Sequence, residues 1–288
     1  MIMRKNKVRM SYDRADFQTF IIVWVTLCLL FALTPLFITV INSLKSNLQI
    51  DRNIFALPDA EIFGAAADNF SKAWDAVKSS ALRSVLVSFV GAVGDCFLGS
   101  VLAYVFTTKK FPFKETIFML FISVMLLPSI MGMPILVPFV KNTLNLGDTF
   151  TGYLLPNFAG GQITCMFMFR IFFGQQPTAI YESARIEGAN DAKIYAKITI
   201  PLSLPIILFQ FVGCFSSLYN DYLWPSLVFT RKMTLMPIML DWQTRFQGLG
   251  ESGAMYAMYI ISGVPLIFTS IISMKYFSSG DFAAGMKL

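Results

Sequence analysis

Six long apolar segments, separated by shorter polar stretches, dominate the hydrophobic pattern of this 288-residue chain. The segments cover residues 20–41, 85–106, 117–140, 152–173, 202–229 and 254–276. Each has at least the roughly 20 residues that a helix needs to cross about 30 Å of hydrocarbon. Backbone polar groups in lipid must be satisfied within each segment, and the runs are too long and too uniformly apolar for barrel strands. The pattern therefore predicts an all-α integral membrane protein built as a six-transmembrane-helix bundle.

The second apolar segment has the features of a helix at the centre of such a bundle. Small residues recur at every fourth position, at Ser84, Ser88, Ala92, Cys96 and Ser100. Small side chains at this spacing let helix backbones approach closely in lipid. Asp95, near the middle of the segment, is costly in hydrocarbon and should face protein or water. It is a candidate for a substrate-contacting or gating role, although a polar link to a neighbouring helix is the favoured interpretation.

Prolines interrupt several of the other segments. Each proline removes an intrahelical hydrogen bond and tends to kink or break a helix. The third segment, which contains LLPSIMGMPILVP, is therefore expected to be broken. Such breaks occur both in transport pathways and in purely structural membrane helices.

Composition supports a membrane protein and narrows the chemistry. Hydrophobic residues make up 56% of the chain and charged residues 14%, against about 25% in soluble domains. The four cysteines fall in four separate segments without a Cys-x-x-Cys pair, so Cys28, Cys96, Cys165 and Cys214 are interpreted as small buried apolar side chains, neither disulfides nor metal ligands. Because the sequence contains no histidine, histidine general bases and Ser-His-Asp triads are excluded.

The distribution of basic residues predicts the orientation of the spans. Arg4, Lys5, Lys7, Arg9 and Arg14 precede the first segment, which is about twice as long as a signal-peptide core and is not followed by a small-residue cleavage site. We therefore expect an uncleaved anchor, with residues 1–19 as a cytoplasmic tail and residues 20–288 as one membrane domain. Most of the 23 Lys and Arg residues then lie on the inner side, so both termini are expected to be cytoplasmic.

One polar stretch on the predicted inner side, residues 174–201, has the pattern of a helix–turn–helix elbow between the fourth and fifth segments. Pro177 suits the first turn of a helix, and Gly188 can supply the left-handed turn that ends it. Asn190 can cap a second helix that leads into the fifth segment. The acidic side chains of this stretch would be repelled by anionic lipid headgroups, which favours a protein partner over a lipid surface.

This stretch resembles the EAA loop of ABC importer permeases, whose pattern is E-A-A, three residues, G, nine residues and I-x-L-P. Glu182, Ser183 and Ala184 take the first three places, Gly188 takes the place of the glycine, and ITIP at residues 198–201 takes the last four. The departures from the pattern are Ser183 for alanine, Glu187 for the aspartate usual before the glycine, and Ile200 for leucine.

In that family the loop docks in a cleft of a cytoplasmic ATPase subunit, so that closure of the ATPase dimer moves the membrane helices. The resemblance therefore implies a cytoplasmic coupling loop at residues 174–201 and a bundle of the ABC type I importer kind. The residues that it implies for ATPase coupling are Glu182, Ser183, Ala184, Arg185, Gly188, Ala189, Ile198 and Pro201.

Further segments are similar to the carbohydrate branch of these permeases, the MalG-like subunits. The likeness is carried by YNDYLWPSLVF at residues 219–229, by LAYVFTTKKFPFK, and by the C-terminal KYFSSGDFAAGMKL. With Asp95, the resulting candidates for the translocation pathway are Tyr219, Asn220, Tyr222 and Trp224. The candidates for a C-terminal contact to the ATPase are Gly280, Gly285 and Lys287. The aromatic candidates can stack on sugar rings, but helix packing is the favoured role for them.

The resemblance predicts a non-catalytic subunit of a larger transporter. No G-x-x-x-x-G-K-[ST] motif occurs, so ATP and Mg are expected on the partner ATPase, with no cofactor or metal in this chain. The other expected partners are a second permease subunit, forming a heterodimer, an extracytoplasmic solute-binding protein, the carbohydrate and membrane lipid. GLGESG, residues 248–253, matches G-x-G-x-x-G but follows no strand of a nucleotide fold, so it is not expected to bind a dinucleotide.

Other functions compete with this prediction. A permease for a non-sugar solute is the closest alternative. A stand-alone secondary carrier would require inverted repeats and buried ion-coupling charges, of which only Asp95 qualifies. A membrane enzyme lacks a cluster of catalytic residue types, and nucleic acid lacks a basic, aromatic surface outside the membrane. The expected function is thus that of a permease forming half of the translocation pathway of an ATP-driven carbohydrate importer in the bacterial cytoplasmic membrane.

Overall fold

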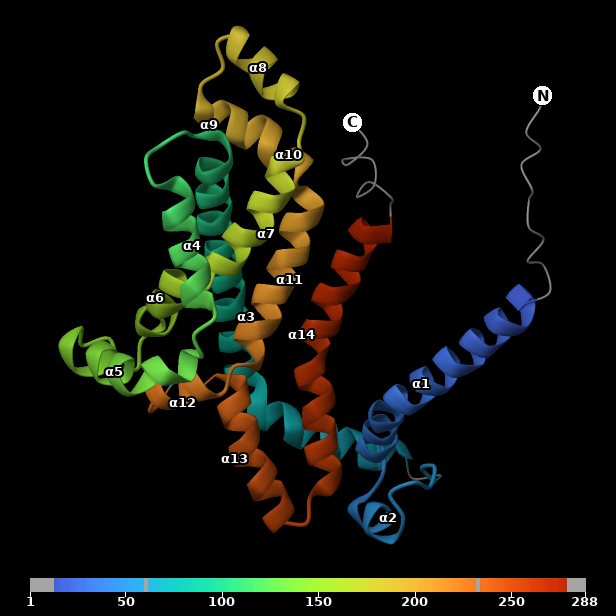
Figure 1. Ribbon diagram of the computed structural model, residues 1–288. Coiled ribbons are helices and arrows are strands. Elements are labelled where there is room, and N and C mark those ends of the chain that lie inside the picture. The colour runs from blue at the N-terminus through green and yellow to red at the C-terminus, as the bar shows by residue number, and fades with distance from the viewer. Residues whose placement is uncertain (1–12, 60–61, 232–233, 279–288) are drawn as a thin grey trace, which may run out of the picture. The chain divides into compact units, whose positions relative to one another are not determined.

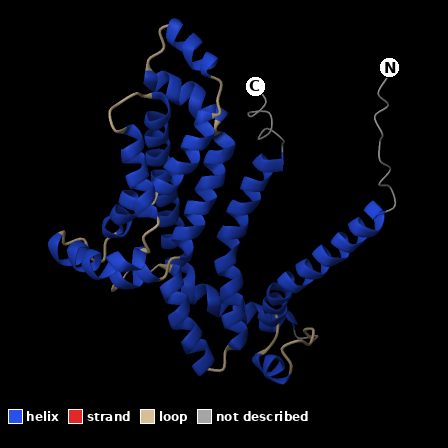
Figure 2. Ribbon diagram, in the orientation of Figure 1, coloured by secondary structure: helices blue, strands red, loops and turns tan. Residues whose placement is uncertain are grey.

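The computed structural model describes residues 13–59, 62–231 and 234–278, and all regular secondary structure in these ranges is helical (Figure 2). The first α-helices are α1 (Asp13–Ser43), α2 (Asn47–Arg52), α3 (Ile62–Thr108) and α4 (Lys114–Met125). Next come η1 (Ser129–Gly132), α5 (Met133–Pro138), the π-helix η2 (Phe139–Thr143), α6 (Phe150–Gly160) and α7 (Gln162–Gly174). The prediction of an all-α protein is confirmed.

The C-terminal half continues the same pattern (Figure 1). It contains α8 (Thr178–Ile186), α9 (Asp191–Ile194), the π-helix η3 (Tyr195–Thr199), α10 (Ile200–Leu202), α11 (Leu204–Asn220), α12 (Leu223–Val228), α13 (Leu235–Gly248) and α14 (Ser252–Ser278). All six predicted segments are therefore helical, although several of them consist of more than one helix.

Three helices are long and apolar enough to cross a membrane alone, at Phe17–Ser43, Phe63–Thr108 and Ser252–Met274. Two bent pairs pass the same test when each pair is taken as one span. They are Lys114–Met125 with Ser129–Thr143, bent by 87°, and Asp191–Leu202 with Leu204–Asn220, bent by 79°. The fourth predicted segment is divided into α6 and α7, which meet at Gly161.

The breaks lie at residues that have an extended backbone or that follow the loss of a helical hydrogen bond at a proline. In the third segment Pro128 is extended, with φ −60° and ψ 121°, and the expected break between α4 and η1 is confirmed. The fifth segment, predicted as one span over residues 202–229, is instead interrupted twice. Pro205 has no N–H to donate to the carbonyl of Pro201, and the helix breaks at Ser203. It ends again where Asp221 becomes extended, before α12 begins.

The chain forms two compact units, each described here by itself. The first comprises Met1–Ala73 and Phe246–Ile260, and the second comprises Trp74–Arg245 and Ile261–Leu288. In the first unit, the side chains of α1 are exposed along residues 17–37. The prediction that every cysteine is buried is therefore wrong for Cys28, because it lies on this exposed apolar helix.

The polar groups of the first unit are satisfied around a buried lysine. The Nζ atom of Lys45 donates to Asn42 Oδ1 at 3.0 Å and to the carbonyl of Ile54 at 2.9 Å. Asn69 donates to the carbonyls of Ser43 and Lys45 at 2.9 and 2.8 Å. GLGESG also lies here, as the turn between α13 and α14, with Gly250 at φ +69°. No strand precedes it in the described residues, which agrees with its rejection as a nucleotide motif.

The core of the second unit is built around α3 and α7. The five small residues of α3 from Ser84 to Ser100 at fourfold spacing are all buried, as the sequence predicts for a central helix. A Cβ atom on Gly99 would lie 2.4 Å from Cβ of Cys165, so glycine is needed for α3 to approach α7 this closely. α7 also packs against α4 and α11. A second apolar cluster, around Tyr153, lies where α6 meets α12.

Candidate functional site

The predicted elbow, residues 174–201, stands at one end of the second unit, where α8 (yellow) and α9 extend beyond the neighbouring helices of that unit (Figure 1). Pro177 is the residue directly before α8, one position earlier than the first turn that the sequence predicts for it. Only Tyr181 and Ala184 are buried, one helical turn apart on the same face. The opposite face is exposed and includes Glu182 and Ile186, whose exposed fraction is 87%. Ile186 is thus an exposed apolar side chain near the end of an otherwise polar helix face.

The turn after α8 has the hydrogen bonds of a left-handed helix end. The N–H of Ala189 donates to the carbonyl of Ala184 at 2.9 Å, and the N–H of Gly188 donates to Arg185 at 3.0 Å. Gly188 has φ +79°, a conformation that costs other residues conformational energy. Asn190 then caps α9, because its Oδ1 accepts from the N–H of Lys193 at 2.9 Å. The predicted helix–turn–helix is confirmed.

The two arms of the elbow are joined at their base by buried polar side chains. The hydroxyl of Tyr181 donates to Gln176 Oε1 and accepts from Thr199 Oγ1 at 3.2 Å. Gln176 in turn donates to Ser203 Oγ at 2.7 Å, at the break between α10 and α11. Burial raises the pKa of the Tyr181 hydroxyl, which therefore stays protonated. Ile198 and Ala189, two of the predicted coupling residues, pack against the apolar core instead of facing outward.

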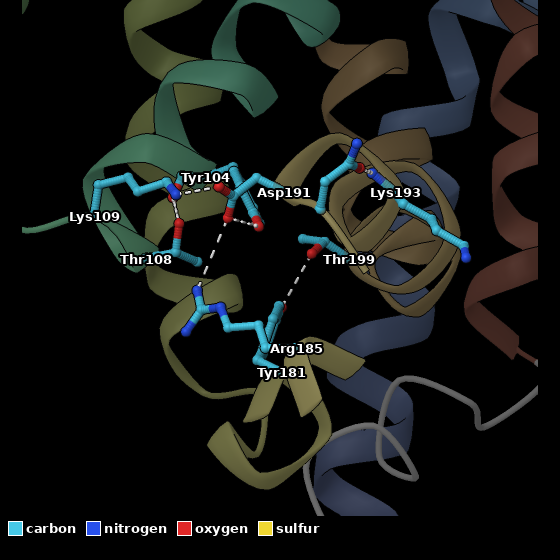
Figure 3. Close-up of polar contacts among 9 residues, drawn as sticks. Tyr104, Thr108, Lys109, Tyr181, Arg185, Asp191, Lys193 and Thr199 are labelled. Carbon is cyan, nitrogen blue, oxygen red and sulfur yellow. Dashed lines mark hydrogen bonds and ion pairs between the residues drawn. The ribbon is translucent and has the colours of Figure 1, made fainter. Parts of the chain in front are cut away.

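A charged cluster fixes the elbow to the end of α3 (Figure 3). Asp191 forms an ion pair with Lys109 and accepts from the Tyr104 hydroxyl at 3.4 Å. A guanidinium nitrogen of Arg185 lies 4.0 Å from Asp191. The hydrogen bond from Lys109 holds the pKa of Asp191 below its usual value. The sequence pattern singled out Arg185. It did not identify Lys109 as a partner of the elbow, because Lys109 and the elbow lie in different segments of the chain.

A cavity of about 320 Å³ lies beside the elbow, and Glu182 and Arg185 contribute to its lining. The other lining residues come from the ends of α3 and α7 and from the start of α8, and include Thr107, Phe173 and Gln176. Pro201 and Ser183 lie on the exposed side of the elbow, and the side chain of Ser183 bonds only to the carbonyl of Ile180. Some of the predicted coupling residues are therefore exposed, and the others form the turn or pack against the apolar core.

Asp95 is buried on α3 and is linked to α6. Its Oδ2 accepts a hydrogen bond from Asn157 Nδ2 at 2.8 Å, while its Oδ1 has no hydrogen-bond partner among the described residues. A Cβ atom on Gly161 would lie 2.7 Å from Asp95 Oδ2 and 2.9 Å from Asn157 Oδ1. Because Gly161 has no side chain, there is room beside it for the carboxylate of Asp95. A polar link to a neighbouring helix, the interpretation favoured from the sequence, is present.

A cavity of about 460 Å³ adjoins this link, and Asn157, Asp221 and Trp224 are among its lining residues. Trp224 is held in place because its indole N–H donates to the carbonyl of Tyr153 at 3.1 Å. Asp221 caps α12 by accepting from the N–H groups of Leu223 and Trp224 at 3.1 and 3.3 Å. Asp221 was not among the predicted pathway residues. Its position inside YNDYLWP is the sequence feature that could have identified it.

The remaining pathway candidates lie elsewhere. Tyr219 is buried, and its hydroxyl donates to the carbonyl of Ser262 at 2.9 Å, which is a packing role. Asn220 is exposed and donates to the carbonyl of Ser216, and Tyr222 is exposed and does not line the cavity. Of the four candidates in this stretch, only Trp224 lines it. Gly280, Gly285 and Lys287 lie outside the described residues.

Residues 95–280 match the family model of the binding-protein-dependent transport system inner membrane component. The chain belongs to this family. The matched region includes the elbow, both cavities and the Asp95 link. The protein is therefore a non-catalytic inner-membrane permease component of an ABC transporter. This assignment rules out a stand-alone secondary carrier and a membrane enzyme.

Individual relatives agree with the assignment. The chain is 27% identical over 265 residues to the inner membrane ABC transporter permease protein YcjP of Escherichia coli (strain K12), covering 91% of this chain and 93% of that one. It is 33% identical over 147 residues, 51% of each chain, to the sn-glycerol-3-phosphate transport system permease protein UgpE of Yersinia pestis. It is also 26% identical over 211 residues to the xylose/arabinose import permease protein XacI of Haloferax volcanii, covering 67% of this chain and 68% of that one.

The fold has a solved counterpart. A chain in the crystal structure of a bacterial ABC transporter involved in the import of the acidic polysaccharide alginate superimposes with a TM-score of 0.78. The match covers 94% of this chain and 99% of that chain at 19% sequence identity. The predicted importer-type permease bundle is thereby confirmed at the level of the fold.

Proposed function

We propose that this chain is one of two permease subunits of an ATP-driven carbohydrate importer, and that its elbow is the docking site for a separate cytoplasmic ATPase. In this arrangement both termini and the elbow are cytoplasmic, as the distribution of basic residues favours. ATP and Mg bind to the ATPase, and an extracytoplasmic binding protein delivers the solute. The second permease differs from this chain, so the two form a heterodimer.

The observation that carries the docking proposal is the form of α8. It is a short helix with two buried positions, and its outward face combines Glu182, Arg185 and the fully projecting Ile186. An apolar side chain surrounded by polar ones can serve as an anchor inside the polar rim of a protein interface. The hydrogen bonds of Tyr181 and Gln176 at its base make the helix a rigid projection. A rigid lever transmits movement, whereas a flexible loop would absorb it.

The carbohydrate proposal is supported by the relatives and by the lining of the larger cavity. UgpE is named for the transport of sn-glycerol-3-phosphate and XacI for the import of xylose and arabinose, and the solved counterpart belongs to a transporter involved in the import of alginate. The cavity presents the indole of Trp224 and the polar groups of Asn157 and Asp221, a combination suited to a sugar ring. Among the described residues that line it there is an acid but no Lys or Arg. This lining suits an uncharged sugar, in contrast to the phosphorylated solute of UgpE and the acidic polysaccharide of the solved counterpart.

Co-purification of the ATPase tests the docking proposal. Gly188→Asp forces a side chain into a left-handed conformation at a position where no atom lies within 4 Å, so the turn is strained without a clash in the core. We expect normal membrane insertion, loss of the bound ATPase and loss of uptake. Gly174→Ala is the matched control, because Gly174 also has open space around it and is not in the left-handed region. Normal uptake by the Gly188→Asp variant would overturn the proposal.

A further inference from the structure

Three cysteine side chains from three different helices meet in the core of the second unit. Cys96 lies on α3, Cys165 on α7 and Cys214 on α11, and their Sγ atoms all lie within 4.8 Å of one another. The Sγ atoms of Cys165 and Cys214 are 3.4 Å apart. Cys96 and Cys165 are buried, and Cys214 is partly buried. The permease function described above uses none of these thiols.

We propose that Cys96, Cys165 and Cys214 form a binding site for a soft monovalent cation, Cu(I). Sulfur ligands from cysteine select soft metal ions such as Cu(I). Metal–sulfur bonds of about 2.3 Å place three sulfurs around one ion about 4 Å apart. This value lies between the 3.4 Å of the closest pair and the 4.8 Å limit of the group, so small side-chain movements bring all three sulfurs into contact with one ion.

The number of ligands favours Cu(I) over Zn²⁺. Structural zinc sites are almost always tetrahedral and have four protein ligands. Within the described residues the group contains three cysteines and no further Cys, Asp or Glu ligand. A three-coordinate ion fits this group as it stands, whereas a tetrahedral ion would need a fourth ligand in an apolar core.

Two polar groups of α11 lie next to the cluster. Gln210 Nε2 donates toward the Sγ atom of Cys214 at 3.9 Å, which stabilises a thiolate there. The thiol of Cys96 donates to the carbonyl of Ile207 at 4.0 Å, a bond that it gives up when its sulfur binds the ion. Cysteine binds metal ions as its thiolate, so each sulfur that bonds to Cu(I) releases its proton to the solvent.

The packing of the helices holds the three ligands together. Gly99 lies one turn from Cys96, and any side chain there would collide with Cβ of Cys165 and with the carbonyl of Gln162. The close approach of α3 and α7 at this point brings the two cysteines within reach of one ion. A groove of about 380 Å³, lined by Cys96 and by apolar residues that include Val93, Phe97 and Phe211, gives a ligand a route to the cluster.

Copper binding is measured on the intact transporter complex purified in detergent. The probe is Cu(I) held by bicinchoninate, whose absorbance falls as the protein withdraws the ion. We expect each copy of the unaltered chain to bind one more equivalent of Cu(I) than the Cys165→Ser variant does. The Cys214→Ser variant should bind Cu(I) at least about tenfold more weakly. Cys28→Ser is the matched control, because Cys28 is exposed on α1 and belongs to no cluster.

Two outcomes would overturn the proposal. One is equal copper uptake by the unaltered complex and by both Cys165→Ser and Cys214→Ser complexes of unchanged thermal stability. The other is an X-ray absorption spectrum of the bound copper with nitrogen or oxygen neighbours in place of sulfur at about 2.3 Å. A spectrum with three sulfur neighbours that is lost in the Cys96→Ser variant supports the site. Because the readout is metal binding, the result does not depend on sugar uptake or on ATPase docking.

Discussion

Lys109, which directly follows α3, and Asp191, the first residue of α9, form an ion pair that fastens the elbow to the end of the longest helix. The N–H of Lys109 still bonds to the carbonyl of Val105 at 3.0 Å, so the lysine backbone continues the helical pattern of α3. In the coupling role proposed above, this ion pair links a displacement of α8 to α3, the helix that carries Asp95. A guanidinium nitrogen of Arg185 on α8 lies 4.0 Å from the same carboxylate.

Removing this ion pair should weaken coupling without unfolding the protein. Both side chains are nearly half exposed, and exposed pairs contribute up to about 1 kcal/mol. We expect Asp191→Asn and Lys109→Met each to lower uptake per ATP hydrolysed by a factor of up to about five. The double variant should be no worse than either single variant, because both remove one interaction. The measurement is sugar uptake and ATP hydrolysis in proteoliposomes.

A second exposed ion pair provides the control for these two single variants and the double variant. Lys78 and Asp75 on α3 are 2.7 Å apart and are more exposed than the first pair. Asp75→Asn and Lys78→Met should leave the coupling ratio unchanged, singly and together. Strictly additive effects at Lys109 and Asp191 would contradict a shared mechanical role for those two residues.

The pH dependence of coupling follows from the lowered pKa of Asp191. The folded-state pKa of this carboxylate lies below the ordinary value of 3.8. Such a carboxylate stabilises the fold at pH values above 3.8. Its contribution is lost only as the pH falls through the lower, folded-state pKa. The pair should therefore persist from pH 5.5 to 7.5. We expect the ratio of uptake by Asp191→Asn to uptake by the unaltered protein to be the same at both pH values. A ratio that rises toward one at pH 5.5 would show that Asp191 titrates in that range.

Adjacent glycines at the junction of α6 and α7 should respond differently to alanine. The new methyl group of Gly161→Ala would lie 2.7 Å from Asp95 Oδ2, whereas no atom lies within 4 Å of the same group at Gly160. We expect Gly161→Ala to lower the free energy of unfolding by about 1–3 kcal/mol, since overpacking a buried site costs that much. Gly160→Ala should not lower it. Thermal unfolding in detergent measures the difference, and equal midpoints would contradict the close packing around Asp95.

Two substitutions at Asp95 separate a structural link from a role in transport. Asp95→Ala leaves the amide of Asn157 without its acceptor and should destabilise the protein by about 1–3 kcal/mol. Asp95→Asn keeps an acceptor oxygen and should retain both stability and most of the uptake. If Asp95→Asn folds normally but uptake is lost, the carboxylate takes part in transport and the favoured structural interpretation is wrong.

The cavity lining predicts which aromatic residue matters for the cargo. Trp224 lines the cavity and Tyr222 does not, although both lie within YNDYLWP. We expect Trp224→Phe to reduce uptake at low sugar concentration by about tenfold, equivalent to about 1.4 kcal/mol of lost interaction. Tyr222→Phe should have no effect. Since the change at Trp224 also removes its bond to Tyr153, unchanged thermal stability is required before the loss is attributed to sugar contact.

The elbow illustrates how much of a site local sequence can specify. Pro177, Gly188 and Asn190 each set the backbone of their own position. The structure confirms the assignments of Gly188 and Asn190, and Pro177 lies one residue before the helix that it was assigned to. The exposed face of α8 follows from the same local pattern. Lys109 could not be predicted as the partner of Asp191, because the pairing depends on where the end of α3 lies relative to α9.

The sequence by itself determined the features that depend on neighbouring residues: the apolar segments, the break at Pro128, the small-residue face of α3 and the elbow. Backbone conformation and the cost of polar groups in lipid act over a few residues, so these features can be read from the order of side chains alone. The tertiary structure decided which distant side chains meet. The Asp95–Asn157 link, the cavity at Trp224 and the cluster of three cysteines arise only when packed helices bring separate segments together, and no local pattern encodes that contact.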